Sequence, residues 1–136
     1  MTGLLEGRVA LVTGASSGNG RAIARLFADH GARVVLADLS EAPREGGETT
    51  AALIEAAHPG RARFVRSDVS RVADLEAAVG AAESWGGLDV MVNNAGILLK
   101  EPILEATEAT FDRMIDVNVR SVLFGSQAAA RVMVPR

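Results

Sequence analysis

The sequence contains no cysteine, no tyrosine and only one lysine, Lys100, among its 136 residues. Without cysteine the chain can form neither a disulfide scaffold nor a thiolate zinc site, and it offers no cysteine nucleophile. The formal net charge of -3 provides no basic surface, so nucleic acid is not an expected partner. The two histidines stand beside residues typical of helix ends, and we expect no metal site.

Long apolar runs are also missing. Glu6 and Arg8 interrupt the apolar residues near the N-terminus, so no signal peptide is predicted. No apolar run is long enough to cross a membrane. With 49% hydrophobic and 23% charged residues, the composition is that of an ordinary soluble domain. We expect one cytoplasmic domain over residues 1–136, with no membrane partner.

Short β-branched runs alternate with helical segments along the chain. The runs predict four strands, at residues 8–13, 33–38, 62–68 and 88–93. The other segments predict helices at residues 18–30, in the later part of 40–58, from a Ser70 cap to about 85, and from about 107 to 133. This alternation implies parallel strands joined by right-handed crossovers. The predicted fold is α/β, a Rossmann-type three-layer arrangement with helices on both faces of a sheet of about four strands.

Three glycines, Gly14, Gly18 and Gly20, follow the first predicted strand and open the first helix in the stretch "TGASSGNG". Without Cβ atoms this loop can turn tightly, and a diphosphate can approach the backbone amides at the helix N-terminus. A tight turn with no ligand is the alternative. Asp38 ends the second strand 18 residues after Gly20, near the spacing at which a carboxylate meets the ribose hydroxyls of NAD. The combination favours dinucleotide binding, although Asp38 by itself could simply end a strand or cap a helix.

Asp38 also indicates which dinucleotide is bound. Its carboxylate would repel the additional phosphate of NADP. No arginine or lysine occupies residues 15–17, and Leu39 and Ser40 follow Asp38, so we expect no cation near that phosphate. The predicted cofactor is NAD, with NADP less favoured.

Three further motifs stand at characteristic positions: "DV" at Asp68-Val69, "NNAG" at residues 93–96 and "DVNV" at residues 116–119. With the glycine loop and Asp38, they make the chain resemble the short-chain dehydrogenase/reductase family from about Leu5 to the last residue. The departure inside the loop is Asn19, where the family more often carries isoleucine. That position contributes mainly a backbone amide, so we expect little consequence.

The resemblance implies a cofactor-binding role at each matching position: Gly14, Ser17, Gly18, Asn19, Gly20, Asp38, Asp68, Val69, Asn94, Ala95 and Gly96. Asp68 and Val69 would flank the adenine, and residues 94–96 would line the path toward the nicotinamide ribose. Asn118 would support the catalytic proton relay by gripping a main-chain carbonyl and a water. Each has a structural alternative: Asp68 could cap a helix, and the asparagines could shape a turn. Asn118 could serve only to form hydrogen bonds within the core, on an apolar helix face that also carries Phe111 and Val122.

The family resemblance also assigns chemistry to a tyrosine, a lysine four residues after it and a serine, all beyond the Asn118 position. The chain has no tyrosine, and Lys100 precedes Asn118. We therefore expect the sequence to be the N-terminal half of a family domain, inactive by itself. Its fourth strand should lie at an exposed sheet edge, and we expect self-association through that edge and homo-oligomers through the long final helix.

Two classes of function remain open. The first is an NAD(P)-dependent oxidoreductase, NAD favoured, that moves hydride between the nicotinamide and a small alcohol or carbonyl substrate. The second is a non-catalytic NAD-binding module or truncated remnant. An S-adenosylmethionine methyltransferase also uses a glycine loop after its first strand, but "NNAG" and "VNV" argue against it.

Overall fold

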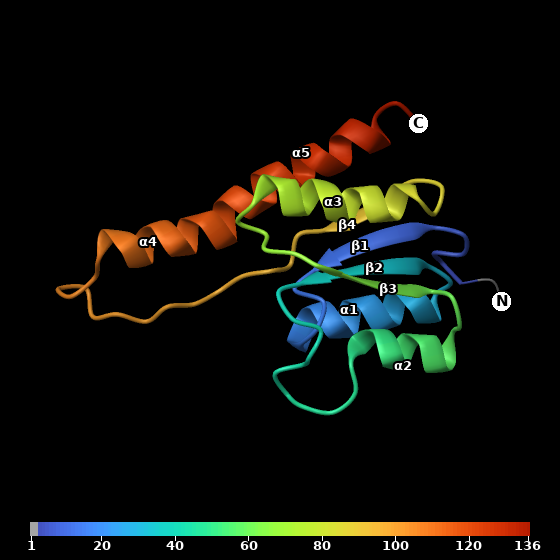
Figure 1. The fold of residues 1–136 in the computed structure, drawn as a ribbon, viewed down its shortest axis with the longest axis horizontal. Coiled ribbons are helices and arrows are strands. Elements are labelled where there is room, and N and C mark those ends of the chain that lie inside the picture. Colours follow the sequence, from blue (N-terminus) through green and yellow to red (C-terminus); the bar gives the residue numbers. More distant parts are fainter. Residues whose placement is uncertain (1–2) are drawn as a thin grey trace.

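A computed structural model describes residues 3–136 and contains one parallel sheet, in the order β3-β2-β1-β4 (Figure 1). The four strands are β1 (Val9–Thr13), β2 (Arg33–Asp38), β3 (Ala62–Arg66) and β4 (Val90–Val92). The predicted α/β fold with about four parallel strands is confirmed. The third and fourth strands are shorter than predicted. The strand β3 ends at Arg66, and β4 pairs with β1 over three residues only.

Helices cover both faces of the sheet, as predicted. On one face lie α1 (Gly18–Asp29) and α2 (Thr50–Ala57), and on the other lie α3 (Val72–Glu83) and α5 (Ser121–Met133) (Figure 1). The helix α4 (Glu108–Ile115) and the loop before it reach away from these layers, and α4 has no buried residue.

The core is divided by the sheet into two halves. The strand β1 is buried on both faces, so its side chains enter the two halves alternately: Leu11 packs toward α3 and α5, and Val12 toward α1 and α2. The helices meet the sheet through small side chains, Ala24, Ala28, Ala78, Ala82 and Ala128 among them. Alanine at these positions lets each helix approach the strands closely without a cavity.

Helix ends follow the sequence signals in part. The first helix ends at Asp29, one residue earlier than predicted, with His30 as C-cap and Gly31 following at a φ of 98°. The prediction that Ser70 caps the third helix is wrong. The N-cap is Arg71, which makes no side-chain cap hydrogen bond, and the Ser70 hydroxyl lies one residue earlier, where it donates to the Asp68 carboxylate at 2.6 Å.

The predicted long final helix is interrupted by a five-residue π-helical turn, η1 (Asp116–Arg120), between α4 and α5. Its buried side is formed by Val117 and continues through Ser121 and Gly125. The apolar face that we predicted around Asn118 is not buried, since Phe111 is 60% exposed and Val122 41% exposed. The sheet and α3 contact the other side of this helix.

The strand β4 lies at the end of the sheet, which confirms the predicted edge within the described residues. Its side chains are half-buried, and α5 passes close to it: a Cβ on Gly125 would lie 2.3 Å from Oδ1 of Asn93. No helix among residues 3–136 is both long and apolar enough to cross a membrane.

Glu55 gives a test of how α2 is fastened to the sheet. Its carboxylate accepts hydrogen bonds from the amides of Gly60 and Ala62, both at 2.7 Å, and these hydrogen bonds hold the pKa of Glu55 below its ordinary value of 4.5. A lowered folded-state pKa contributes stability above the unfolded value, and that stability is lost as pH falls through the folded value. Glu55→Gln should lower the free energy of unfolding by about 1 kcal/mol at neutral pH.

The difference from wild type should narrow below pH ~4 in urea titrations. Glu83→Gln, on the exposed side of α3, is the matched control and should have little effect at either pH. A loss for Glu55→Gln that is equally large at neutral and acid pH would contradict this role.

Candidate functional site

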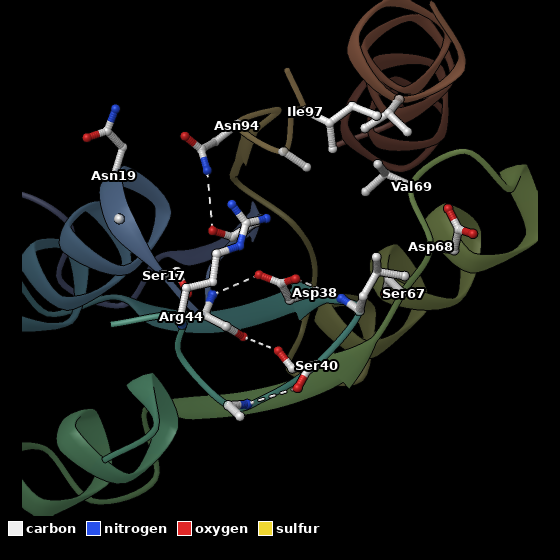
Figure 2. A pocket seen from close by; sticks show the side chains of 18 of the residues that line it. Ser17, Asn19, Asp38, Ser40, Arg44, Ser67, Asp68, Val69, Asn94 and Ile97 are labelled. Carbon is white, nitrogen blue, oxygen red and sulfur yellow. Dashed lines mark hydrogen bonds between the residues drawn. The ribbon is translucent and has the colours of Figure 1, made fainter. Parts of the chain in front are cut away.

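A cavity of about 570 Å³ opens at the carboxyl ends of the four strands. In an open α/β sheet this is where ligands bind, next to the strand at which the order reverses, here β1 between β2 and β4. All predicted cofactor-binding residues except Gly20 line it (Figure 2): Gly14, Ser17, Gly18, Asn19, Asp38, Asp68, Val69, Asn94, Ala95 and Gly96. Four loops far apart in the sequence therefore meet at one cavity.

The glycine loop has no space for side chains at two of its glycines. Gly14 has a φ of 64°, and a Cβ there would lie 3.0 Å from the Cα of Ala95. Gly20 does not line the cavity, but a Cβ on it would lie 2.0 Å from the Gly14 carbonyl oxygen. The first turn of α1 is thus pressed against the loop, which leaves the loop backbone open to the cavity. The Asn19 side chain lies apart from the other labelled side chains in Figure 2.

The ends of β1 and β4 are joined by a hydrogen-bonded junction at Thr13. Its hydroxyl oxygen accepts from the amides of Asn94 and Ala95, both at 3.0 Å. The Asn94 side chain donates back to the Thr13 carbonyl at 2.9 Å. Asn94 therefore positions the glycine loop through its side chain. Thr13 was not predicted as a site residue, because a strand-ending threonine carries no distinctive sequence signal.

Asp38 hydrogen-bonds to the backbone of two segments that line the cavity. Its carboxylate accepts from the amide of Ser16 at 3.0 Å and from the amide of Leu39 at 2.8 Å. Each carboxylate oxygen can accept a second hydrogen bond, so these two contacts leave acceptor capacity toward the cavity.

Asp68 gives the cavity a polar surface, and the adjacent Val69 gives it an apolar one. The Asp68 carboxylate accepts from the amide of Ser70 at 3.0 Å and from its hydroxyl at 2.6 Å. The pKa of Asp68 is lowered chiefly by the Ser70 hydroxyl, against the opposing effect of burial, so Asp68 is charged at neutral pH. Val69 is buried with Leu75 and Val117, which places it between α3 and η1.

Asn118 does not line this cavity, but it holds Ile97, which does. Its side-chain oxygen accepts from the Ile97 amide, and its side-chain nitrogen donates to the Ile97 carbonyl, both at 2.8 Å. Asn118 and Ile97 also line a second hollow of about 750 Å³, which shares Ala95 and Gly96 with the first. The expected grip on a main-chain carbonyl is present, although Asn118 itself is exposed.

The cavity wall includes residues that the sequence did not indicate: Ser16, Leu39, Ser40, Ala42, Arg44, Glu45, Ser67, Ile97, Arg113 and Val117. Two cations, Arg44 and Arg113, line the same cavity as Asp38, which the sequence did not predict. Arg44 belongs to a polar loop before α2, and Arg113 comes from α4, so neither neighbours Asp38 in the sequence. Within residues 3–136, no cluster of three His, Asp or Glu side chains is arranged to hold a metal ion.

Comparison with known proteins gives one consistent result. The profile of the family described as short chain dehydrogenase matches residues 8–136. The chain is 45% identical to the mitochondrial borneol dehydrogenase of Lavandula x intermedia, over 96% of this chain and 48% of that protein. It is 46% identical to the L-2,3-butanediol dehydrogenase of Corynebacterium glutamicum, over 91% of this chain and 48% of that protein.

Solved structures agree. A short chain dehydrogenase from Mycobacterium smegmatis superposes with a TM-score of 0.85 at 37% identity, covering 96% of this chain and 54% of that one. A short-chain dehydrogenase/reductase from Brucella melitensis superposes with a TM-score of 0.82 at 34% identity, covering 97% of this chain and 54% of that one. The chain spans about half the length of the relatives that it matches.

Gly20 and Gly80 form a matched pair that tests the close approach of α1. Both lie inside helices, but a Cβ on Gly20 would overlap the Gly14 carbonyl, whereas a Cβ on Gly80 meets nothing within 4 Å. Gly20→Ala should lower the free energy of unfolding by about 3 kcal/mol. Gly80→Ala should raise it by about 1 kcal/mol through helix propensity. Thermal or urea melts measure both, and equal effects would show that the contact between Gly20 and Gly14 is not tight.

Proposed function

Because the chain belongs to the short-chain dehydrogenase family, we propose that it forms the NAD-binding part of an oxidoreductase acting on a small alcohol or carbonyl compound. The observation that carries the proposal is a glycine-lined cavity at the carboxyl ends of the strands, beside the N-terminus of α1. Backbone amides and the helix dipole favour an anion there. A dinucleotide diphosphate meets that requirement.

The wall residues fit a dinucleotide in an extended arrangement. The diphosphate would lie against the backbone of Gly14, Ser17, Gly18 and Asn19, with Gly20 keeping α1 close to the loop. The adenosine ribose would be held by the spare acceptor capacity of Asp38. The adenine would lie between Asp68 and Val69, since one offers an acceptor and the other an apolar surface.

The other half of the dinucleotide would pass Asn94, Ala95 and Gly96 toward the second hollow. When bound, the nicotinamide supplies the hydride donor or acceptor. Asn118 would support catalysis by fixing Ile97 through two hydrogen bonds. In this reading Asn118 is a positioning residue, because its side-chain atoms are engaged with the backbone.

We favour NAD over NADP on the charge of Asp38. A ribose 2′-phosphate beside this carboxylate would meet Coulomb repulsion, whereas a 2′-hydroxyl could donate to it. Arg44 and Arg113 line the same cavity, so the preference for NAD requires that the carboxylate of Asp38, and not one of these two guanidinium groups, lies nearest the ribose.

Apolar side chains exposed on the final helices support self-association. Phe111 is 60% exposed, Val119 56% and Leu123 62%. An apolar surface of this kind favours protein contacts, and we propose that the protein forms homo-oligomers through it.

Asp38→Asn tests the ribose assignment. The amide keeps the shape but loses the charge and one acceptor, so NAD affinity should fall about tenfold. NADP affinity should fall less, because the repulsion disappears as well. Calorimetry measures both, with Asp112→Asn on α4 as the control. Unchanged NAD affinity in Asp38→Asn would contradict the assignment.

Turnover distinguishes an enzyme from a non-catalytic binding module. The family resemblance assigns proton transfer to a tyrosine, and the 136 residues contain none. The 136-residue chain should therefore bind NAD without producing NADH from a panel of primary and secondary alcohols. NADH formation above the protein-free rate would overturn the assignment of proton transfer to tyrosine.

A further inference from the structure

The loop between β2 and α2, residues 39–49, folds back over the glycine loop. The Ser16 hydroxyl donates to the Ser40 carbonyl at 2.6 Å, and the Arg44 amide donates to the Ser17 hydroxyl oxygen at 2.8 Å. The Arg21 side chain donates to the Glu48 carbonyl at 2.8 Å. The loop is therefore fastened at its start, middle and end to the segment that surrounds the proposed diphosphate position.

Glu45 places a carboxylate at the N-terminus of α1. One carboxylate oxygen accepts from the amide of Gly18 at 3.2 Å and lies 3.8 Å from Nε of Arg21. The pKa of Glu45 lies below its ordinary value, first because its own backbone amide donates to it, with the Gly18 amide and the Arg21 charge acting in the same direction. Glu45 is thus a negative charge at neutral pH.

The Gly18 amide is the first amide of α1, where an anionic ligand would also bind. Glu45 and a diphosphate would therefore require the same donor. They would also repel each other at this distance, because both are negatively charged. The Glu45 side chain is 45% exposed, so it can turn into solvent without breaking the hydrogen bonds that fasten the loop.

Arg44 stands beside Glu45 with the opposite charge. Arg44 lines both the 570 Å³ cavity and the 750 Å³ hollow, and Figure 2 shows its side chain in the first of these. Among residues 3–136 its guanidinium forms no ion pair within 4.0 Å, in contrast to the Arg21 side chain. An arginine that borders an anion-binding cavity without a carboxylate partner is free to pair with a phosphate.

We propose that Glu45 occupies the diphosphate position in the free protein and leaves it when a dinucleotide binds, while Arg44 pairs with the incoming diphosphate. The inference rests on the proposed dinucleotide site and adds a charge exchange within one loop. Glu45 lowers the affinity for any ligand with phosphates, and Arg44 raises it. A ligand that lacks phosphate is affected by neither.

Calorimetric titrations of the whole 136-residue chain with NAD, NADP, ADP and adenosine test this exchange at low ionic strength, where charge effects are largest. Glu45→Gln removes the charge at the Gly18 amide, Arg44→Gln removes the guanidinium charge at the cavity wall, and Glu41→Gln is the control in the same exposed loop. Circular dichroism establishes that each variant retains the wild-type fold.

Glu45→Gln should bind NAD and ADP about threefold to tenfold more tightly than wild type, and Arg44→Gln should bind them more weakly by a similar factor. Glu41→Gln should match wild type, and adenosine should bind all four proteins equally.

Three outcomes would overturn the exchange. The first is NAD and ADP affinity in Glu45→Gln equal to or below that of wild type. The second is a change of the same size for adenosine, which would indicate a purely structural effect. The third is an Arg44→Gln effect on NADP without one on ADP, which would assign Arg44 to the ribose phosphate. Failure of NAD, ADP and adenosine alike to bind wild type would instead contradict the proposed dinucleotide site.

Discussion

The hydroxyl group of Thr13 joins the ends of two neighbouring parallel strands, β1 and β4. It accepts from the amides of Asn94 and Ala95, and the Asn94 side chain returns a hydrogen bond to the Thr13 carbonyl. The chain diverges on either side of this junction, into the glycine loop after β1 and the extended segment after β4. Because the two backbones are tied where they separate, the crevice between them has a fixed width. The lack of a Cβ on Gly14 and Gly20 then lets α1 close one side of that crevice.

Carboxylates that accept from backbone amides organise the rest of the rim. Asp38 holds the amide of Ser16, Asp68 holds the amide of Ser70, and Glu45 holds the amide of Gly18. These loops lie at the edge of the apolar core and contribute few side chains to it, Ala15 and Val69 among them. Charged acceptors fix such loops because their hydrogen bonds are stronger than those of neutral acceptors. The same negative charges influence which ligands can enter, so loop order and ligand preference depend on the same groups.

The sequence predicted the parts whose signals are local. The strands β1 and β2 are apolar, largely β-branched runs buried on both faces, and Gly14 and Gly20 stand where a Cβ would clash, so the local order of residue types located them. The role of the 39–49 loop was not predicted, because the loop is polar, shows no hydrophobic periodicity, and is held by hydrogen bonds to residues up to 27 positions away. The contribution of Arg44 to the cavity therefore required the three-dimensional structure. The structural alternative for Asn118, a polar side chain on a buried apolar face, does not hold, because Phe111 and Val122 of that face are exposed and an apolar stripe is buried only where another element covers it.

The π-helical turn between α4 and α5 gives the final helices a tolerance of length that an α-helix does not have. A π turn holds one more residue than the α turn that it replaces. Loss of one residue within 116–120 could be absorbed by rewinding this turn as α-helix, with Val117 or its neighbour still facing α3. Loss of a residue within α5 would instead rotate everything after it by about 100°. It would turn Ala128 and Ala129 away from the sheet.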